Sequence, residues 1–129
     1  DGSFQEGQFY EKLDGKRILE LGAGPGLTGL AIAKAFPTAR VHLTDYNPAL
    51  LENLEEVVSM AGFENVKVSK LDWNDCLEPG WAIEDDGPYD LIIAADCVYH
   101  HMPAAFTAAI LQLQEHSPKV RTIILSPAE

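Results

Sequence analysis

Three glycines alternate between Gly22 and Gly26, directly after an apolar stretch from Arg17 to Leu21 that is typical of a β-strand. Apolar residues with helical spacing follow from Leu27 to Phe36. Glycine adopts positive φ angles without strain, and it has no Cβ to keep a ligand away from the main chain. The pattern therefore predicts a strand, a loop that faces a ligand, and a helix. A simple turn between two elements is the alternative.

The spacing of these glycines distinguishes the loop from one common group of nucleotide-binding loops. Dinucleotide-binding proteins carry the pattern G-x-G-x-x-G. Counted from Gly22, Leu27 stands where that pattern has its last glycine. The loop therefore argues against an NAD-dependent oxidoreductase, which is kept as an alternative.

Length and composition indicate one globular domain. The chain has 129 residues, 47% of them apolar, and no apolar run approaches a membrane-spanning length. We divide it into an N-terminal extension at residues 1–14 and a domain at residues 15–129, and we expect no membrane partner. The N-terminal residues lack the basic and apolar segments of an export signal, which predicts a location in the cytoplasm, with the nucleus as the alternative.

Charge and cysteine content argue against two further classes of protein. The formal net charge is −11. Binding along a nucleic-acid backbone requires clustered Lys and Arg, so we expect no nucleic-acid partner. Cys76 and Cys97 lack the spacing of a zinc site or a disulfide framework, and no metal is expected. We expect both cysteines to pack as small apolar residues.

Strand and helix patterns alternate along the chain. Strands are expected at 17–21, 40–44, 66–71, 91–95 and 122–125, helices at 27–36, 48–61 and 103–115, and a loop at 79–88. The buried face of the helix at 48–61 is expected to carry Leu50, Leu51, Leu54, Val57, Val58 and Ala61. This alternation predicts an α/β fold with a mostly parallel sheet that is covered on both faces.

Carboxylates stand at the ends of the first four expected strands, as Glu20, Asp45, Asp72 and Asp96. In a parallel sheet these ends lie along one edge, where open α/β sheets bind their ligands. An acidic crevice favours a ligand with hydroxyls, amines and a net positive charge over a ligand with several phosphates. S-adenosylmethionine has these groups, and it is the cofactor that we expect.

Several segments together resemble known sequence motifs. The set resembles the ordered motifs of class I, seven-strand methyltransferases, and it consists of Glu20 to Gly26, Asp45, Leu71-Asp72-Trp73 and Ala95 to Tyr99. More narrowly, Asp72-Trp73 with Asp96-Cys97-Val98-Tyr99 resembles the protein lysine methyltransferases marked by a D-x-x-Y motif. The resemblance covers Lys16 to Pro127. It implies a three-layer, Rossmann-like sheet of strand order 3-2-1-4-5 and methyl transfer to a lysine side chain of a protein.

The resemblance implies that the glycine loop holds the methionine part of the cofactor. Gly22, Gly24 and Gly26 would let this part lie on the main chain, with its carboxylate at the N-terminus of the next helix. Glu20 would order the loop or bind the amino group, and a strand-end charge turned to water is the alternative. Ala95 is small where the sulfonium would pass close to the backbone.

Residues after the second and third strands would bind the adenosine part. Asp45 would accept hydrogen bonds from both ribose hydroxyls, and Tyr46 would flank the adenine. Asp72 would accept a hydrogen bond from the adenine amino group, and Trp73 would form an aromatic wall beside the ring. A turn-forming Asp45 and a core Trp73 after an Asp turn are the alternatives.

Asp96 and Tyr99 are the catalytic residues that the resemblance implies. Asp96 would orient the lysine nitrogen through a hydrogen bond, while Tyr99 would line a channel whose desolvation favours the neutral amine. A cap for Asp96 and a half-buried core position for Tyr99 are the alternatives.

The chain also departs from the class that it resembles. Class I methyltransferases have two strands after the fifth, and these are absent here because the chain ends at Glu129. We therefore expect an exposed edge at strand 122–125, which would pair with a second copy in a homodimer or with another partner. A non-catalytic S-adenosylmethionine-binding or interaction module and a small-molecule methyltransferase remain alternatives.

Overall fold

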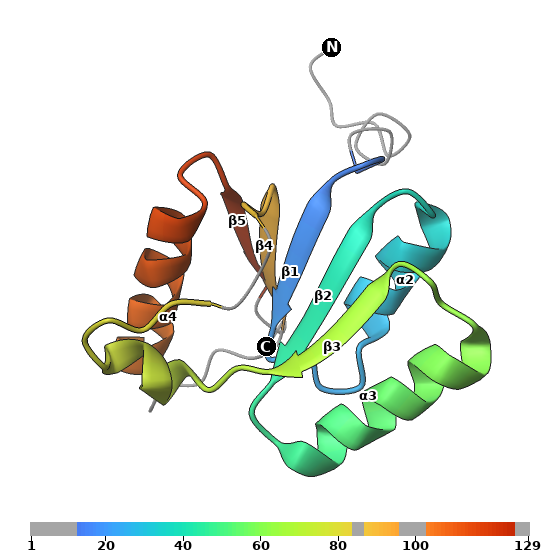
Figure 1. Ribbon diagram of the computed structural model, residues 1–129, viewed down its shortest axis with the longest axis horizontal. Coiled ribbons are helices and arrows are strands. Elements are labelled where there is room, and N and C mark those ends of the chain that lie inside the picture. The colour runs from blue at the N-terminus through green and yellow to red at the C-terminus, as the bar shows by residue number, and fades with distance from the viewer. Residues whose placement is uncertain (1–12, 84–86, 96–102, 126–129) are drawn as a thin grey trace.

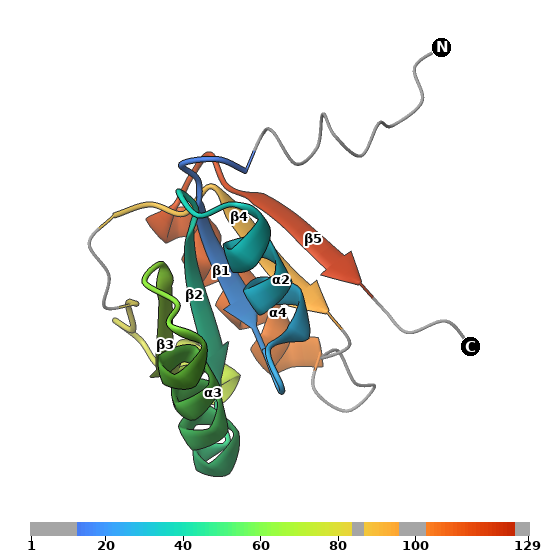
Figure 2. The same cartoon turned by 90° about the vertical axis from the view of Figure 1, so that its right-hand side faces the viewer.

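The computed structural model describes residues 13–83, 87–95 and 103–125. Strands and helices alternate along these residues (Figures 1 and 2). The elements, in chain order, are β1 (Arg17–Leu21), α2 (Leu27–Ala35), β2 (Arg40–Asp45), α3 (Pro48–Ala61), β3 (Val66–Lys70), the 3-10 helix η1 (Trp73–Leu77), β4 (Leu91–Ala95), α4 (Pro103–His116) and β5 (Arg121–Leu125).

The strands of the described segments form one sheet in the order β3-β2-β1-β4-β5. Every neighbouring pair is parallel. Helices α2 and α3 cover one face, and α4 with η1 covers the other (Figure 1). The predicted α/β class and strand order are confirmed. Because all the strands run the same way, their C-terminal ends share one side of the sheet, which we call the carboxyl edge.

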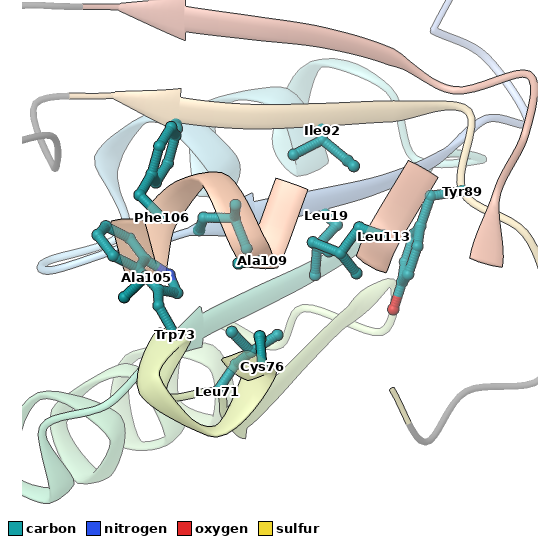
Figure 3. Packing of buried hydrophobic residues seen from close by; sticks show 12 residues of the cluster. Leu19, Leu71, Trp73, Cys76, Tyr89, Ile92, Ala105, Phe106, Ala109 and Leu113 are labelled. Carbon is teal, nitrogen blue, oxygen red and sulfur yellow. The ribbon is translucent and has the colours of Figure 1, made fainter. Parts of the chain in front are cut away.

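Side chains alternate between the two faces along each strand, so that the sheet contributes to two cores. Leu19 of β1 and Ile92 of β4 pack under α4, against Phe106 and Leu113 (Figure 3). Trp73 joins this core edge-on to Phe106, with ring centroids 5.0 Å apart. A cluster of large buried side chains on both faces fixes the positions of the strand ends.

The other face of the sheet is covered by α2 and α3. Ile18 and Leu43 of the sheet pack against Ala33 of α2 and Leu54 of α3. Helix α3 begins at Pro48 because the Asn47 side chain accepts hydrogen bonds from the first free main-chain amides. The two helices therefore hold β1 and β2 from one side, and these strands carry the residues of the predicted loop site.

The predicted element bounds agree closely with the structure. β1, α3 and β4 have the predicted bounds, and each of the other predicted elements differs by one residue at one end. The helix η1 was not predicted, because a single 3-10 turn has too few residues to show an apolar period. Among the described helices, none is long and apolar enough to cross a membrane.

The buried face of α3 is narrower than predicted. Leu54 is buried, whereas Val57 is 44% exposed and Ala61 is also exposed. The predicted stripe rests on apolar spacing alone. Val58 is half-buried, so the core covers only part of the apolar face of α3.

Asn65, just before β3, joins three parts of the fold. Its side-chain amide donates hydrogen bonds to the main-chain oxygens of Ala33, Phe36 and Ala39, at 2.9–3.2 Å. Its own carbonyl accepts a hydrogen bond from the Val41 amide. One half-buried side chain therefore satisfies carbonyls at the end of α2 and in the turn to β2.

We predict that Asn65→Ala lowers the free energy of unfolding by about 2 kcal/mol, because it removes the side-chain hydrogen bonds to three main-chain carbonyls. Urea unfolding followed by circular dichroism measures this change. Asn53→Ala, at an exposed position of α3, is the matched control and should change the stability by less than about 0.5 kcal/mol. Equal losses in the two variants would contradict the assigned role of Asn65.

Candidate functional site

The glycine loop after β1 has a left-handed backbone at each of its three glycines. The φ angles are 60° at Gly22, 56° at Gly24 and 80° at Gly26. Gly26 is also the N-cap of α2, and no side chain caps the helix at this position. The amides of Ala23, Gly24 and Gly26 are hydrogen-bonded within the chain, so the loop offers the carboxyl edge chiefly the N-terminus of α2 with its partial positive charge.

Gly24 and Gly26 differ in what surrounds them. A Cβ on Gly26 would lie 2.5 Å from Leu54 Cδ2, so this glycine is required by the packing of α3. A Cβ on Gly24 would meet no atom within 4 Å. Gly24 is therefore the position of the loop at which the main chain borders open space, as a ligand-facing glycine must.

Asp45, at the end of β2, holds the glycine loop in place. One of its carboxylate oxygens accepts a hydrogen bond from the Gly24 amide at 3.0 Å, and the other accepts one from the Asn47 amide at 3.0 Å. The side chain is only 5% exposed. The carboxylate therefore connects the loop after β1 to the turn before α3. Each oxygen still has a lone pair for a further donor, so the predicted ribose contact remains compatible with this arrangement.

Glu20 lies beneath the loop and is 2% exposed, which makes the alternative of a water-facing charge wrong. Its carboxylate accepts a hydrogen bond from the Gly29 amide in the first turn of α2, at 3.1 Å. Burial raises the pKa of Glu20 to about 7, although the Gly29 bond acts in the opposite direction. This contact anchors the start of α2 to β1, and binding of a cofactor amino group stays a prediction.

Asp72 and Trp73 have structural contacts of their own. Asp72 caps η1, because its Oδ1 accepts hydrogen bonds from the main-chain and side-chain amides of Asn74. Trp73 is 8% exposed and packs against Phe106, as the alternative of a core tryptophan predicted. Figure 3 shows its ring turned toward α4. A contact of either residue with adenine stays a prediction.

The remaining predicted residues lie at the same edge or outside the described residues. Tyr46 is 61% exposed, directly after Asp45, and Ala95 is half-buried at the end of β4. Asp96 and Tyr99 lie outside the part of the chain that the structure describes. The parallel register therefore brings the described candidates to the carboxyl edge, while the roles of the catalytic pair stay predictions.

The sequence predicted no metal site and two cysteines that pack as small apolar residues. Within the described segments, no group of three or more His, Cys, Asp or Glu side chains is placed to hold a metal ion. Cys76, in η1, is buried and unpaired with another cysteine, as expected of a small packing residue. Burial, with the charges of Asp75 and Asp72, raises its pKa to about 11, so the thiol stays protonated at neutral pH. Cys97 lies outside the described residues.

Three residues that support the site were not predicted. Gly29 supplies the amide that Glu20 binds, and a Cβ at this position would collide with Leu43. Thr44 donates a hydrogen bond from its hydroxyl to the Glu20 carbonyl at 2.7 Å. Asn47 caps α3 and donates its own amide to Asp45. The sequence carried two signals for them. Asn47 stands directly before Pro48, as a helix N-cap does, and Gly29 completes the spacing G-x-G-x-x-G with Gly24 and Gly26, which the count from Gly22 missed.

A parallel sheet in this order, with a glycine loop after β1 and ligand-facing carboxyl ends, is a Rossmann-like fold. A solved S-adenosylmethionine-dependent methyltransferase from Aquifex aeolicus has this fold, with a TM-score of 0.70 and 20% sequence identity. The match covers 94% of this chain and 63% of that protein.

The family follows from sequence comparison. The family model described as lysine methyltransferase matches residues 3–127, and the chain belongs to this family. It is 40% identical over 116 residues to the protein N-lysine methyltransferase METTL21A of Danio rerio, covering 88% of this chain and 49% of that protein. It is 38% identical over 93 residues to a calmodulin-lysine N-methyltransferase of Arabidopsis thaliana, covering 69% of this chain and 29% of that protein. The chain thus spans about half, or less, of the length of these relatives.

We predict that Glu20 makes the stability depend on pH. Its pKa is higher in the folded chain than the ordinary value of 4.5, so the folded state binds more protons between these values. This group therefore stabilises the fold most below about pH 4.5, and its contribution falls, by up to about 3 kcal/mol, as the pH rises through about 7. Glu20→Gln keeps an oxygen for the Gly29 amide and removes the titration.

Urea unfolding of both proteins between about pH 5 and about pH 8 measures this effect. The wild type should lose stability relative to Glu20→Gln as the pH rises. Glu115→Gln, at an exposed position of α4, should show no such relative change. A constant difference between the wild type and Glu20→Gln would mean that Glu20 titrates near its ordinary pKa.

Proposed function

We propose that the chain is the cofactor-binding part of an enzyme that transfers a methyl group from S-adenosylmethionine to a lysine side chain of a protein. Membership of the lysine methyltransferase family and the names of the two relatives support the reaction and the substrate class. The observation that carries the cofactor assignment is the open main chain at Gly24, held by the Asp45 carboxylate.

The residues at the carboxyl edge fit the cofactor in charge and in hydrogen-bonding capacity. The N-terminus of α2, which carries a partial positive charge, suits the carboxylate of the methionine part. Asp45 suits the ribose hydroxyls, because each of its oxygens accepts one main-chain amide and keeps a second lone pair. The acidic residues around this loop favour a cationic ligand over a polyphosphate.

Residues next to η1 and β2 suit the adenine part of the cofactor. Both hydrogen bonds to Asp72 go to Oδ1, and no donor among the described residues reaches Oδ2, which suits the adenine amino group. Tyr46 is exposed beside Asp45 and offers its ring face to an adenine. Trp73 is held in the core by Phe106, so we assign it the role of a rigid support for Asp72.

Bound S-adenosylmethionine supplies an activated methyl group, which passes to a neutral amine nitrogen while the C–S electron pair stays on sulfur and the new ammonium loses a proton. The chain needs to position the amine in line with this methyl group. β4 ends with Ala95 at the carboxyl edge, and Asp96 and Tyr99 are the first and fourth residues after this strand. We propose that Asp96 orients the amine and that Tyr99 lines its channel.

Further expectations from the sequence remain part of the proposal. A homodimer or another partner at β5 is supported by its place at the end of the strand order, where among the described strands it pairs only with β4. A monomer in sedimentation at high concentration would contradict a homodimer. The acidic charge supports a protein partner over a nucleic acid. The cytoplasmic location also stays a proposal.

We predict that Gly24→Ala abolishes measurable binding of S-adenosylhomocysteine, because the new methyl group enters the space bordered by the loop. Gly62→Ala is a matched control, since Gly62 also has a positive φ angle and open space within 4 Å of where its Cβ would stand, but it lies at the end of α3. Each variant should lose about 1–2 kcal/mol of stability from backbone strain.

Calorimetric titration with S-adenosylhomocysteine, and in parallel with NAD, measures both variants and the wild type. The wild type and Gly62→Ala should bind S-adenosylhomocysteine with similar affinity and should not bind NAD. If Gly24→Ala bound S-adenosylhomocysteine with the affinity of the wild type, the loop would not be part of the cofactor site. Binding of NAD alone would favour the oxidoreductase alternative.

We predict that Asp96→Asn slows methyl transfer to lysine by about 100-fold, because the amine loses its orienting partner. The measurement uses methyl-labelled S-adenosylmethionine and a protein extract, followed by hydrolysis and detection of methyl-lysine. Asp75→Asn, at an exposed position of η1, should retain the wild-type rate. Cofactor binding without any labelled lysine would support the alternative of a non-catalytic module. Label confined to small molecules would support the alternative of a small-molecule methyltransferase.

A further inference from the structure

A hollow lies at the opposite end of the sheet from the glycine loop. It has a volume of about 400 Å³ and is lined by residues at the starts of β1, β2 and β3, together with Tyr89 from the segment before β4. This size lies within the range of pockets that bind small molecules. The hollow is thus separated from the proposed cofactor site by the length of the strands.

Basic side chains are concentrated in this hollow. Among the described residues of its lining, Arg17, Arg40 and Lys67 are basic and Glu64 is acidic, and the Asp90 carboxylate accepts the Arg17 amide beside it. The whole chain has nine Lys and Arg residues against twenty Asp and Glu. A third of the basic side chains therefore surround one hollow of a strongly acidic protein.

The strand register places these cations on one face. Arg17 of β1 lies directly opposite Arg40 of β2, and His42 of β2 lies opposite Lys67 of β3. Arg40 and His42 are two residues apart, so both side chains point to the same face of the sheet. An anion on this face would therefore be within reach of more than one cation.

The floor of the hollow is rigid and polar. His42 is 5% exposed, and its ring nitrogens lie 2.7 Å from the Tyr89 hydroxyl and 2.5 Å from the Ser69 hydroxyl. The Tyr89 amide donates a hydrogen bond to the Ser117 hydroxyl at 2.7 Å. These contacts fix β2, β3 and the segments before β4 and β5 to one another. The hollow therefore has a defined shape without a ligand.

The aromatic ring of Tyr89 also positions Arg17. The guanidinium carbon lies 5.2 Å from the centre of this ring, within the range of a cation–π contact. The Arg17 amide donates a hydrogen bond to the Asp90 carboxylate at 2.8 Å, which fixes the start of β1. An oriented guanidinium binds phosphate oxygens in pairs and loses less entropy than a free one.

We propose that this hollow binds a small phosphate-bearing anion through Arg17, Arg40 and Lys67, separately from the cofactor at the carboxyl edge. A ligand of compact size is favoured over a long polyanion, because the rest of the surface is acidic and repels an extended chain of negative charge. The proposal is independent of the methyl-transfer reaction, since it rests on a different edge of the sheet.

Calorimetric titration with inorganic pyrophosphate, at low and constant ionic strength, tests the proposal. We expect saturable binding to one site, weakened about tenfold or more in Arg40→Gln/Lys67→Gln, since both charges contact the anion. Lys70→Gln/Lys119→Gln removes the same charge from exposed positions outside the hollow, Lys70 at the far end of β3. This control should weaken binding by less than about twofold.

Three results would overturn the proposal. The first is the absence of saturable binding to the wild type. The second is an equal loss of affinity in the two double variants, which would mean that general charge attracts the anion. The third is full competition between pyrophosphate and S-adenosylhomocysteine, which would place the anion at the carboxyl edge. Thermal unfolding of each variant checks that the fold is retained.

Discussion

The hydrogen bond from the Gly24 amide to the Asp45 carboxylate is the contact on which the geometry of the proposed cofactor site depends. It joins a loop that follows β1 to the end of β2, and the second oxygen of the same carboxylate holds the turn before α3. Glu20, beneath the loop, similarly accepts a hydrogen bond from the Gly29 amide in the first turn of α2. Two buried carboxylates thus fix the loop through its main chain, and their acidity also suits a cationic ligand.

The two cores explain why this loop can be held so closely. One core fixes β1 and β4 under α4, and the other fixes β1 and β2 against α2 and α3. β1 belongs to both and is the central strand of the sheet, so the glycine loop begins from a strand that is held on both faces. Burying Glu20 in this position has a cost, which appears as its raised pKa. The hydrogen bond from Gly29 offsets only part of that cost.

Apolar period and the glycine and proline positions are local signals, so they predicted the sheet and its elements to within one residue, whereas the strand order followed from the family resemblance. Other features depend on contacts that are distant in sequence. The family resemblance assigns Trp73 to a ligand wall, but its partner Phe106 lies 33 positions further along, and no local signal pairs the two. The main-chain partners of Glu20 and Asp45 depend on φ angles that no residue type fixes alone. Asp96 and Tyr99 rest on motif resemblance only.

The choice of main-chain partners by Asp45 also bears on how this loop can vary among related proteins. The carboxylate binds an amide and not a side chain, so the contact survives replacement of an exposed neighbour such as Pro25. Gly24 is restricted by its φ angle, and Gly26 and Gly29 are restricted by packing. Residues on the outer rim of the loop can therefore differ between related proteins while its inner contacts stay in place.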